Sequence, residues 1–293
     1  MERILTAAQK KPLMLKSLPF FVMHLMPLGM LVTGARPRDF ALCAFLYFSR
    51  MFFITGAYHR YFSHRTYKMG RVMQFLMAWG GGTAAQRGAL WWAAHHRDHH
   101  KYSDQPKDVH SPKDGLFWAH VGWIISPMAD GTKYDRIKDL SKYPELVWLN
   151  KYHLVPPIVL GVTVYALGGA SALFCGFFLS TVLLYHGTFT INSLSHVWGT
   201  RRYSTKDTSR NSLILALVTL GEGWHNNHHY YSASTSQGFY WWEIDISYYI
   251  LKALSWVGLT QEVKRPPAKV RERNKVVDVG DEGLGIAPPA AAE

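Results

Sequence analysis

Four long apolar runs dominate the pattern of hydrophobic and polar positions along the chain. Each approaches the roughly 20 apolar residues that cross a bilayer as an α-helix. Arg50 is the one charged residue inside them, and the last two runs are separated only by the small residues around Ser171. The pattern predicts an all-α integral membrane protein whose four transmembrane helices form two hairpins, at residues 18–34, 40–58, 154–170 and 172–191.

The segments between and after these runs predict a helical cap outside the membrane, made of residues 59–153 and 192–261. Three of its apolar stretches are too short to span a bilayer and are expected at the interface or packed on the cap: 72–85, 212–220 and 244–258. From Glu262 the composition changes to Pro, Lys, Arg, Gly and Ala. We therefore expect one domain over residues 1–261 and a solvated tail over 262–293.

Lysine and arginine are distributed unevenly about the predicted spans. Four spans place both termini and the whole cap on one side, which carries 29 of these residues. The loop after Gly34 carries 2, and the turn around Ser171 carries none. By the positive-inside rule, the cap and both termini are cytoplasmic. The formal net charge of +12 thus reflects membrane topology, and without a compact basic motif with stacking aromatics it predicts no nucleic-acid partner.

Fifteen histidines occur in the 293 residues, and their spacing is more informative than their number. Residues at i, i+3 and i+4 share one face of an α-helix. Two segments have three histidines in this spacing, namely His96, His99 and His100, and then His225, His228 and His229. The repeated spacing predicts two histidine-rich helix faces that converge on one site.

Two further pairs lie at the cytoplasmic ends of predicted spans. His59 and His64, in HRYFSH, are five residues apart, about 140° around a straight α-helix. They are expected to reach different metal ions unless one lies beyond the helix end. Asn192 and His196, in NSLSH, are four residues apart and are expected to face one side of the fourth helix. The topology brings all of these clusters to the same membrane face.

The number and type of these side chains indicate a metal centre. Imidazole binds zinc, copper, iron and nickel, whereas Cys43 and Cys175 fall inside predicted spans and argue against a cysteine-rich zinc site. One four-coordinate ion cannot use nine imidazoles, but two ions can, with positions left open for dioxygen or held by water near Asn192. An oxidising site needs a redox metal, and zinc has no redox chemistry. Two iron ions are therefore the favoured prediction.

Four segments carry a resemblance to a known family: TGAYHRYFSHRTYK, HHRDHHKYSD, NSLSHVWG and GEGWHNNHH. They are similar to the signature segments of the membrane-bound Δ9-type fatty acyl desaturases, the stearoyl-CoA desaturase-like family, and the likeness covers about residues 40–260. It implies an O2-dependent oxidoreductase that inserts a cis double bond, at Δ9, into a saturated acyl chain with two electrons at a di-iron centre. It also implies that Asn192 reaches a metal through water and that nine histidines are metal ligands: His59, His64, His96, His99, His100, His196, His225, His228 and His229.

The same resemblance implies partners. The sequence contains no His-Pro-Gly-Gly segment of the kind that binds haem, so we expect a separate electron donor, a ferredoxin or a cytochrome b5-like protein. A basic cytosolic surface attracts an acidic donor. Animal acyl-CoA members carry an Arg-Asp pair and an Arg-Lys pair close to CoA, where this chain has Ala94-His95 and Pro127-Met128. Acyl-CoA, acyl-lipid and acyl-carrier-protein substrates all stay open, and the lipid bilayer is an expected partner.

Two other functions compete with desaturation. A histidine-rich di-iron membrane hydroxylase shares the metal site, and a non-catalytic metal-binding membrane protein, such as a transporter or sensor, shares the histidines. The HRYFSH spacing and the NSLSHVWG segment favour desaturation over hydroxylation. A transporter is expected to hold its ionisable ligands near the bilayer midplane rather than at one membrane surface.

Other polar residues near the boxes have plainer interpretations. Four carboxylates are expected either to orient imidazole N–H groups or to be solvated acids: Asp98, Asp104, Asp108 and Glu222. His95 is expected either to support the metal site or to be a core residue. The remaining histidines are expected to be ordinary surface or core residues: His24, His110, His120, His153 and His186.

Overall fold

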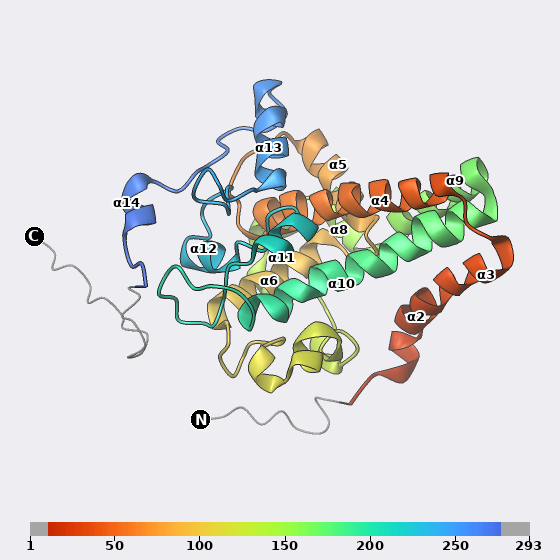
Figure 1. The fold of residues 1–293 in the computed structure, drawn as a ribbon, viewed down its shortest axis with the longest axis horizontal. Coiled ribbons are helices and arrows are strands. Elements are labelled where there is room, and N and C mark those ends of the chain that lie inside the picture. Colours follow the sequence, from red (N-terminus) through yellow and green to blue (C-terminus); the bar gives the residue numbers. More distant parts are fainter. Residues whose placement is uncertain (1–10, 277–293) are drawn as a thin grey trace, which may run out of the picture.

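The computed structural model describes residues 11–276, and its helices and connecting loops contain no β-strand over these residues. Figure 1 shows long helices side by side in one half of the molecule, with the short helices α12 (His225–Tyr230) and α14 (Ala268–Glu272) at the opposite end. Three helical stretches are long and apolar enough to cross a membrane: Met14–Thr33, Pro37–Ser63 and Val155–His196. The prediction of an all-α protein with membrane-capable helices is confirmed.

The first apolar stretch is a helix with an irregular centre. α2 (Met14–Leu25) leads through the 3-10 turn η1 (Met26–Gly29) into α3 (Met30–Thr33). Pro27 has no N–H to donate within a regular α-helix, which accounts for the change of geometry here. Gly34, with φ 68°, ends the helix, because glycine adopts a positive φ without steric cost.

The second apolar stretch changes its helix type halfway. α4 (Pro37–Phe52) has proline in its first turn, and the Asp39 carboxylate accepts the backbone N–H of Arg36 at 2.9 Å. The helix continues directly into η2 (Phe53–Ser63), a π-helix whose hydrogen bonds join residues five apart. This wider turn changes which side chains share a face of the helix.

The third apolar stretch folds back at Gly169. α9 (Val155–Ser171) contains Gly169 at φ 74° and leads into η7 (Ala172–Leu179), a π-helix, and then into α10 (Ser180–Asn192). The break lies among the small residues that separate the last two apolar runs of the sequence. Glycine is the residue type that adopts this backbone conformation most readily.

Small residues let the long helices approach one another closely. A Cβ added at Gly161 in α9 would lie 3.4 Å from the ring of Phe177 in η7. The helices before and after the break at Gly169 therefore pack against each other. A Cβ added at Gly176 would lie 2.7 Å from the side chain of Leu42 in α4. Such contacts are typical of helix packing within membranes.

Arg50, the charge inside the second apolar run, is buried. Its guanidinium donates to the Leu46 carbonyl at 2.9 Å and to the Thr181 hydroxyl at 2.7 Å. The side chain thus ties α4 to α10, as expected for an ionisable residue that must find its partners inside the protein.

The cap is built from shorter helices on the connections and at the C-terminal side. An apolar core around Phe62, Leu90 and Leu149 packs the end of η2 against the helices that follow it. The α-helices of the cap are α5 (Arg71–Gly82), α6 (Ala89–Tyr102), α7 (Lys138–Ser141), α8 (Pro144–Lys151), α11 (Leu213–Val218), α12, α13 (Ile246–Trp256) and α14. Single turns lie between them, at η3 (Pro112–Asp114), η4 (Trp118–Gly122), η5 (Pro127–Ala129), η6 (Tyr134–Arg136) and η8 (Leu194–His196).

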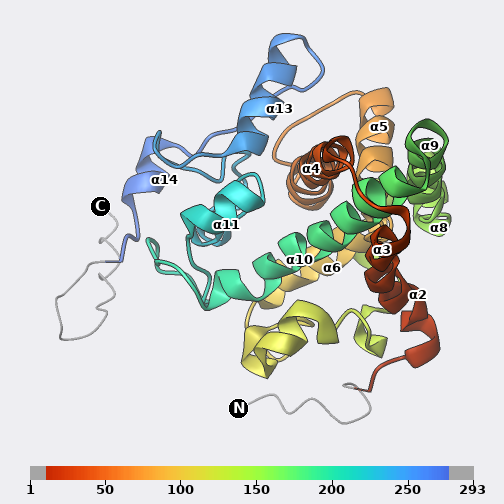
Figure 2. The same ribbon diagram turned by 45° about the vertical axis from the view of Figure 1, so that its right-hand side comes forward.

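Residues 262–276, within the predicted solvated tail, pack against the cap. The Tyr203 hydroxyl donates to the Arg271 carbonyl at 2.9 Å, and the Val276 N–H donates to the Arg202 carbonyl at 2.8 Å. In Figure 2, α14 again lies on the side of the molecule away from α9. The rest of the predicted tail, 277–293, is outside the described residues.

Candidate metal centre and adjoining cavity

Nine histidines form two groups at the cap end of the long helices. In each group the ring nitrogens lie within 4.8 Å of one another. The first group has five members, namely His59, His64, His96, His100 and His228. The second has four, namely His99, His196, His225 and His229. The structure therefore brings together all nine histidines that the sequence singled out.

The two helices with the i, i+3, i+4 spacing contribute to both groups. In α6, His96 and His100 belong to the first group and His99 to the second. In α12, His225 and His229 belong to the second group and His228 to the first. Positions i+3 and i+4 lie on either side of position i around a helix, so one triplet can face two neighbouring centres. The sequence predicts the shared face but not this division.

His59 and His64 lie in the same group, so they do not face different centres. His64 is the first residue beyond the π-helix η2, and its N–H donates to the His59 carbonyl at 3.2 Å, across five residues. Their ring centroids are 4.9 Å apart. The separation of about 140° assumed α-helical geometry, and the wider π turn removes it.

Four of the histidines direct Nδ1 at a buried carboxylate. These pairs are His59 with Glu222, His99 with Asp108 (3.0 Å), His196 with Asp104 (3.1 Å) and His229 with Asp207 (2.7 Å). A carboxylate that accepts the Nδ1–H fixes the ring and leaves Nε2 as an unprotonated donor atom. The second group has three such pairs and the first has one.

Three of the four carboxylates singled out in the sequence make these contacts. Asp98 instead pairs with Lys133 at 2.7 Å and Arg136 at 2.6 Å. Asp207, which the sequence does not single out, makes the fourth contact of this kind, with Nδ1 of His229. It lies 22 residues from His229 in a loop and reaches it only through the tertiary fold, so no local spacing indicates the pair.

Burial sets the proton affinity of the site. It is the main cause that lowers the pKa of five imidazoles well below the ordinary value of 6.5, and the neighbouring imidazoles add to it, at His64, His96, His100, His225 and His228. For His229, burial outweighs the opposing effect of Asp207 and lowers the pKa to about 4. Burial alone raises the pKa of Asp207, but the His229 contact outweighs it and the net shift is downward. Near neutral pH these imidazoles are therefore uncharged and available as ligands.

The donor atoms fit metal ions. The Nε2 atoms of His59 and His228 face each other at 2.9 Å, and the Nδ1–H of His59 is held by Glu222, so its Nε2 presents a lone pair. Nε2 of His225 lies 3.1 Å from Nε2 of His196, whose Nδ1 is held by Asp104, and Nε2 of His229 is buried with no hydrogen-bond partner among the described residues. Lone pairs crowded together in this way are satisfied by a shared cation, and imidazole suits iron.

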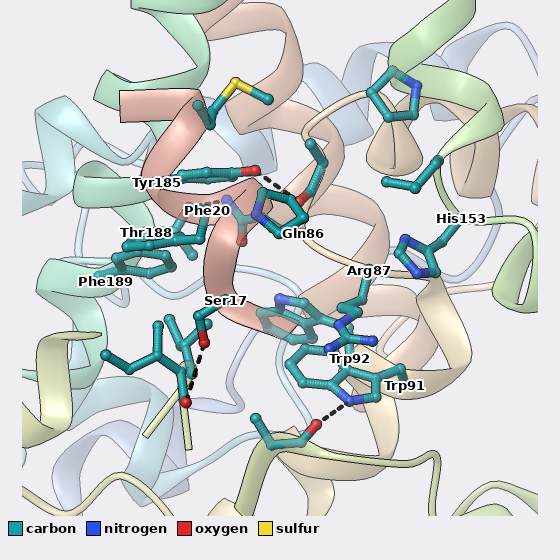
Figure 3. A pocket seen from close by; sticks show the side chains of 18 of the residues that line it. Ser17, Phe20, Gln86, Arg87, Trp91, Trp92, His153, Tyr185, Thr188 and Phe189 are labelled. Atoms are coloured by element: carbon teal, nitrogen blue, oxygen red, sulfur yellow. Dashed lines mark hydrogen bonds between the residues drawn. The ribbon is translucent and has the colours of Figure 1, made fainter. Parts of the chain in front are cut away.

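A cavity of about 950 Å³ adjoins the first group. This volume is in the range of small-molecule sites. His96 of the first group and Asn192 both line it, so a molecule in the cavity can reach the histidines. Figure 3 shows the aromatic side chains around it, from α2, α6 and α10: Phe20, Trp91, Trp92, Tyr185 and Phe189.

The cavity has one hydrogen-bonded polar pair on its wall and an opening along α9. Gln86 donates to the Thr188 hydroxyl at 3.0 Å on the cavity wall (Figure 3). Ile158 and Val162 line the cavity and yet are more than half exposed. The cavity is therefore open on the outer side of α9, where the exposed surface is apolar.

Three histidines expected to be ordinary form a connected chain. His24 Nε2 lies 3.2 Å from His186 Nε2, whose Nδ1 lies 3.0 Å from His120 Nε2. His120 Nδ1 lies 2.9 Å from the Ser193 hydroxyl, next to Asn192. The chain links α2, α10 and η4, and no spacing in the sequence predicts it.

His95 and His110 lie close to the site without belonging to either histidine group. His95 Nδ1 donates to the Trp91 carbonyl at 3.0 Å, and the ring lines the cavity. His110 packs against His99, with 4.3 Å between ring centroids, and stands close to Asp108. His95 is therefore a buried residue of the cavity wall and is not a member of either histidine group.

The chain is similar to known proteins over most of its length. The family model described as fatty acid desaturase matches residues 39–267. An sn-2 palmitoyl-lipid 9-desaturase of Nostoc sp. (strain 36) is 38% identical over 215 residues, which are 72% of this chain and 75% of that protein. Delta-9 acyl-lipid desaturase 2 of Arabidopsis thaliana is 38% identical over 227 residues, 76% of this chain and 74% of that protein. An icosanoyl-CoA 5-desaturase of Limnanthes douglasii is 34% identical over 226 residues, 76% of this chain and 64% of that protein.

Proposed function

Since the chain belongs to the fatty acid desaturase family, we propose that it inserts a cis double bond, at the Δ9 position, into a saturated acyl chain with O2 and two electrons at a di-iron centre. The observation that carries this proposal is the position of His96, which belongs to the five-histidine group and also lines the large apolar cavity. An acyl chain in that cavity would have methylene groups beside the histidines. Family membership makes the enzyme an oxidoreductase of lipid metabolism.

The nine histidines would hold the two irons, one in each group, with Asn192 reaching a metal through water. The irons, when bound, supply the oxidising chemistry that removes hydrogen from unactivated carbon. Glu222, Asp104, Asp108 and Asp207 keep Nδ1–H on their histidines, so that Nε2 is free to bind metal.

The cavity wall would decide which carbon atoms react. Aromatic and aliphatic side chains exclude water from the chain and hold it in one path. The hydrogen-bonded pair of Gln86 and Thr188 lies on this wall. A fixed path past His96 supports selection of one position along the acyl chain.

The proposed topology has four spans in two hairpins, with the termini and the metal site in the cytoplasm. The fold at Gly169 supports a division of the third apolar stretch into two spans. The distribution of lysine and arginine, 29 against 2, supports the cytoplasmic assignment of the cap.

The acyl carrier is proposed to be a membrane lipid or CoA, and the electrons to come from a separate ferredoxin or cytochrome b5-like protein. The relatives include both an acyl-lipid and an acyl-CoA desaturase. The opening of the cavity along the apolar surface of α9 supports entry of a chain from the bilayer.

Expression in a host that lacks its own desaturase tests the proposal. Total fatty acids are analysed by mass spectrometry with double-bond localisation, in the presence of iron and a reducing partner. A new Δ9 monoene is expected. A hydroxylated product without an alkene would identify a hydroxylase instead, and an unchanged profile would contradict both.

His99→Ala and His228→Ala test the ligand sets. His99 is the one histidine of α6 in the four-histidine group, and His228 is the one histidine of α12 in the five-histidine group. Each is expected to abolish the product and to lower the iron content of the purified protein, while the membrane helices still insert. His24→Gln, outside both groups, is the control and is expected to keep iron. Full activity in either alanine variant would remove that residue from the ligand set.

A further inference from the structure

A column of aromatic rings leads outward from the four-histidine group. Tyr230 follows His229 directly at the end of α12. The ring of Tyr203 is stacked on that of Tyr230, with 4.1 Å between centroids and 10° between planes. Tyr203 is completely buried. The column therefore begins at the residue that follows a histidine of the site and passes through the buried Tyr203.

The column continues to the surface through two more rings. The hydroxyls of Tyr203 and Tyr240 both donate to the carbonyl of Arg271, at 2.9 Å and 3.2 Å. Trp242 stacks on Tyr240 at 4.7 Å, with 17° between the planes, and is 52% exposed. Two stacked pairs of rings, joined at the Arg271 carbonyl that accepts both tyrosine hydroxyls, thus connect solvent to the residue that follows His229.

Three cations lie around the outer end of this path, and two of them are paired with carboxylates, Arg202 with Glu243 and Lys275 with Glu272. Arg202 lies over the ring of Tyr240 at 4.7 Å, and Arg271 and Lys275 lie 5.7 Å from its centroid. We call the surface formed by these three cations with Tyr240 and Trp242 the basic aromatic face. The segment 262–276 that borders it carries six lysines and arginines against two glutamates.

The basic aromatic face lies at the end of the molecule away from the apolar helices. α14, which carries Arg271, is at the opposite end from α3 and the turn of α9 (Figure 1). With the long helices in a bilayer, this face would project into the aqueous phase. A soluble protein could reach it there without contact with lipid.

The proposed reaction needs electrons that the substrate does not supply. Reduction of O2 to two waters takes four electrons and four protons. Conversion of CH2–CH2 to CH=CH releases two of each, so two electrons and two protons must come from elsewhere. A one-electron carrier protein therefore has to donate twice in each turnover.

We infer that the basic aromatic face docks an acidic one-electron carrier protein, and that Trp242, Tyr240, Tyr203 and Tyr230 carry each electron inward to the metal centre. The inference rests on the proposed function. The cations give charge complementarity to an acidic partner, which speeds its encounter and fixes its orientation. Trp242, which stacks on Tyr240 and is half exposed, is the contact point for the partner.

Matched charge reversals test the docking surface in the full-length protein in lipid nanodiscs. The double variant Lys269→Glu/Arg273→Glu changes two exposed cations beside the face, and Lys138→Glu/Lys142→Glu makes the same change on exposed positions of α7 and its end. Reduction of the iron centre is followed by stopped flow, with a plant-type [2Fe–2S] ferredoxin, with an acidic cytochrome b5 and with dithionite.

The first double variant is expected to weaken the faster protein donor about tenfold and to flatten its salt dependence, without the same loss for dithionite. The control pair is expected to behave as wild type. Equal effects from the two pairs, or an equal loss with dithionite, would overturn the docking surface. Reduction of wild type by dithionite but by neither protein would also overturn it, whereas a wild-type protein without reducible iron would contradict the proposed function instead.

Substitutions along the column separate electron transfer from a merely structural role. Trp242→Leu removes an exposed ring without disturbing the core, and Tyr203→Phe keeps the buried ring while removing its hydroxyl. Trp242→Leu is expected to slow electron entry about tenfold at saturating protein donor, and Tyr203→Phe to stay within about twofold of wild type. Wild-type rates in Trp242→Leu, with an unchanged melting temperature, would overturn the route through this ring.

Discussion

The Nδ1 atom of His229 lies 2.7 Å from Oδ2 of Asp207, and this contact joins the four-histidine group to a loop that precedes it by 22 residues. The Ser209 N–H donates to the other carboxylate oxygen at 3.0 Å, so the acid is held on both sides. Asp207→Asn keeps the size of the side chain and removes its charge. We expect a loss of about 10- to 100-fold in iron affinity or activity, because the imidazole tautomer is no longer fixed.

Metal analysis of the purified variant, together with product formation, checks this expectation. Asp135→Asn serves as the matched control, because the Asp135 side chain is 70% exposed and contacts no histidine of the two groups. Wild-type iron content and activity in Asp207→Asn would show that Asp207 does not position His229.

Arg60 supports the other side of the site and gives a prediction about stability. It is buried and donates to both oxygens of Asp245, at 2.8 Å and 3.0 Å, and to Glu222 at 3.2 Å. Asp245 also accepts the Tyr248 N–H at 3.0 Å at the start of α13. Removal of one member of a buried ion network leaves the others uncompensated, which costs about 3–5 kcal/mol.

Asp245→Asn is therefore expected to lower the free energy of unfolding by about that amount, and the loss of negative charge beside Arg60 is its cause. The measurement is the thermal or denaturant midpoint of the purified protein in detergent. Glu272→Gln, which removes an exposed carboxylate paired with Lys275, is expected to change the midpoint little. Equal midpoints for Asp245→Asn and wild type would show that the network is not stabilising.

The sequence predicts the histidines of the site well because they repeat a helical spacing that depends only on local geometry. Both triplets converge as expected, although each divides between two groups. The relation between His59 and His64 could not be predicted, since it depends on a π-helix, and the apolar run that forms η2 has no composition that distinguishes it from an α-helix. The position of the fold in the third apolar stretch is predictable, because glycine is present there.

Sequence alone does not reveal the contacts of the site that join segments far apart in the chain. Asp207 and the chain from His24 to Ser193 depend on loops and helices that meet only in the folded protein. The packing of 262–276 has the same origin. Its composition is typical of a solvated tail, but Tyr203 and Tyr240 provide a surface to which its backbone binds.

Gly161 offers a prediction about substrate length. It lines the cavity opposite Phe177, and a Cβ at this position would be 3.4 Å from the ring. Gly161→Ala should therefore fit with a small shift, whereas Gly161→Leu fills part of the cavity. We expect the leucine variant to prefer shorter acyl chains than wild type by about tenfold, since the fit of one or two methylene groups is worth 10-fold or more.

A graded series of saturated acyl chains, supplied in competition and analysed by mass spectrometry, measures this preference. Gly161→Ala is the control and is expected to keep the wild-type order of chain lengths. An unchanged order in Gly161→Leu, with normal iron content, would place the acyl chain elsewhere than beside Gly161.

His95 gives a prediction about pH that does not depend on bound metal. Burial is the main cause that lowers the pKa of His95 from 6.5 to about 4. Between these two values the unfolded chain binds a proton that the folded chain does not, so stability falls as the pH is lowered. At about 1.4 kcal/mol for each pH unit, this one residue contributes a loss of about 3 kcal/mol between pH 6.5 and pH 4.

The variant His95→Asn tests this pH dependence, because asparagine keeps a donor for the Trp91 carbonyl but does not titrate. In iron-free protein, its unfolding midpoint should therefore fall less steeply between pH 7 and pH 4.5 than that of wild type, while the difference between the two proteins stays constant above pH 7. Parallel curves over the whole range would show that His95 is not held neutral in the fold.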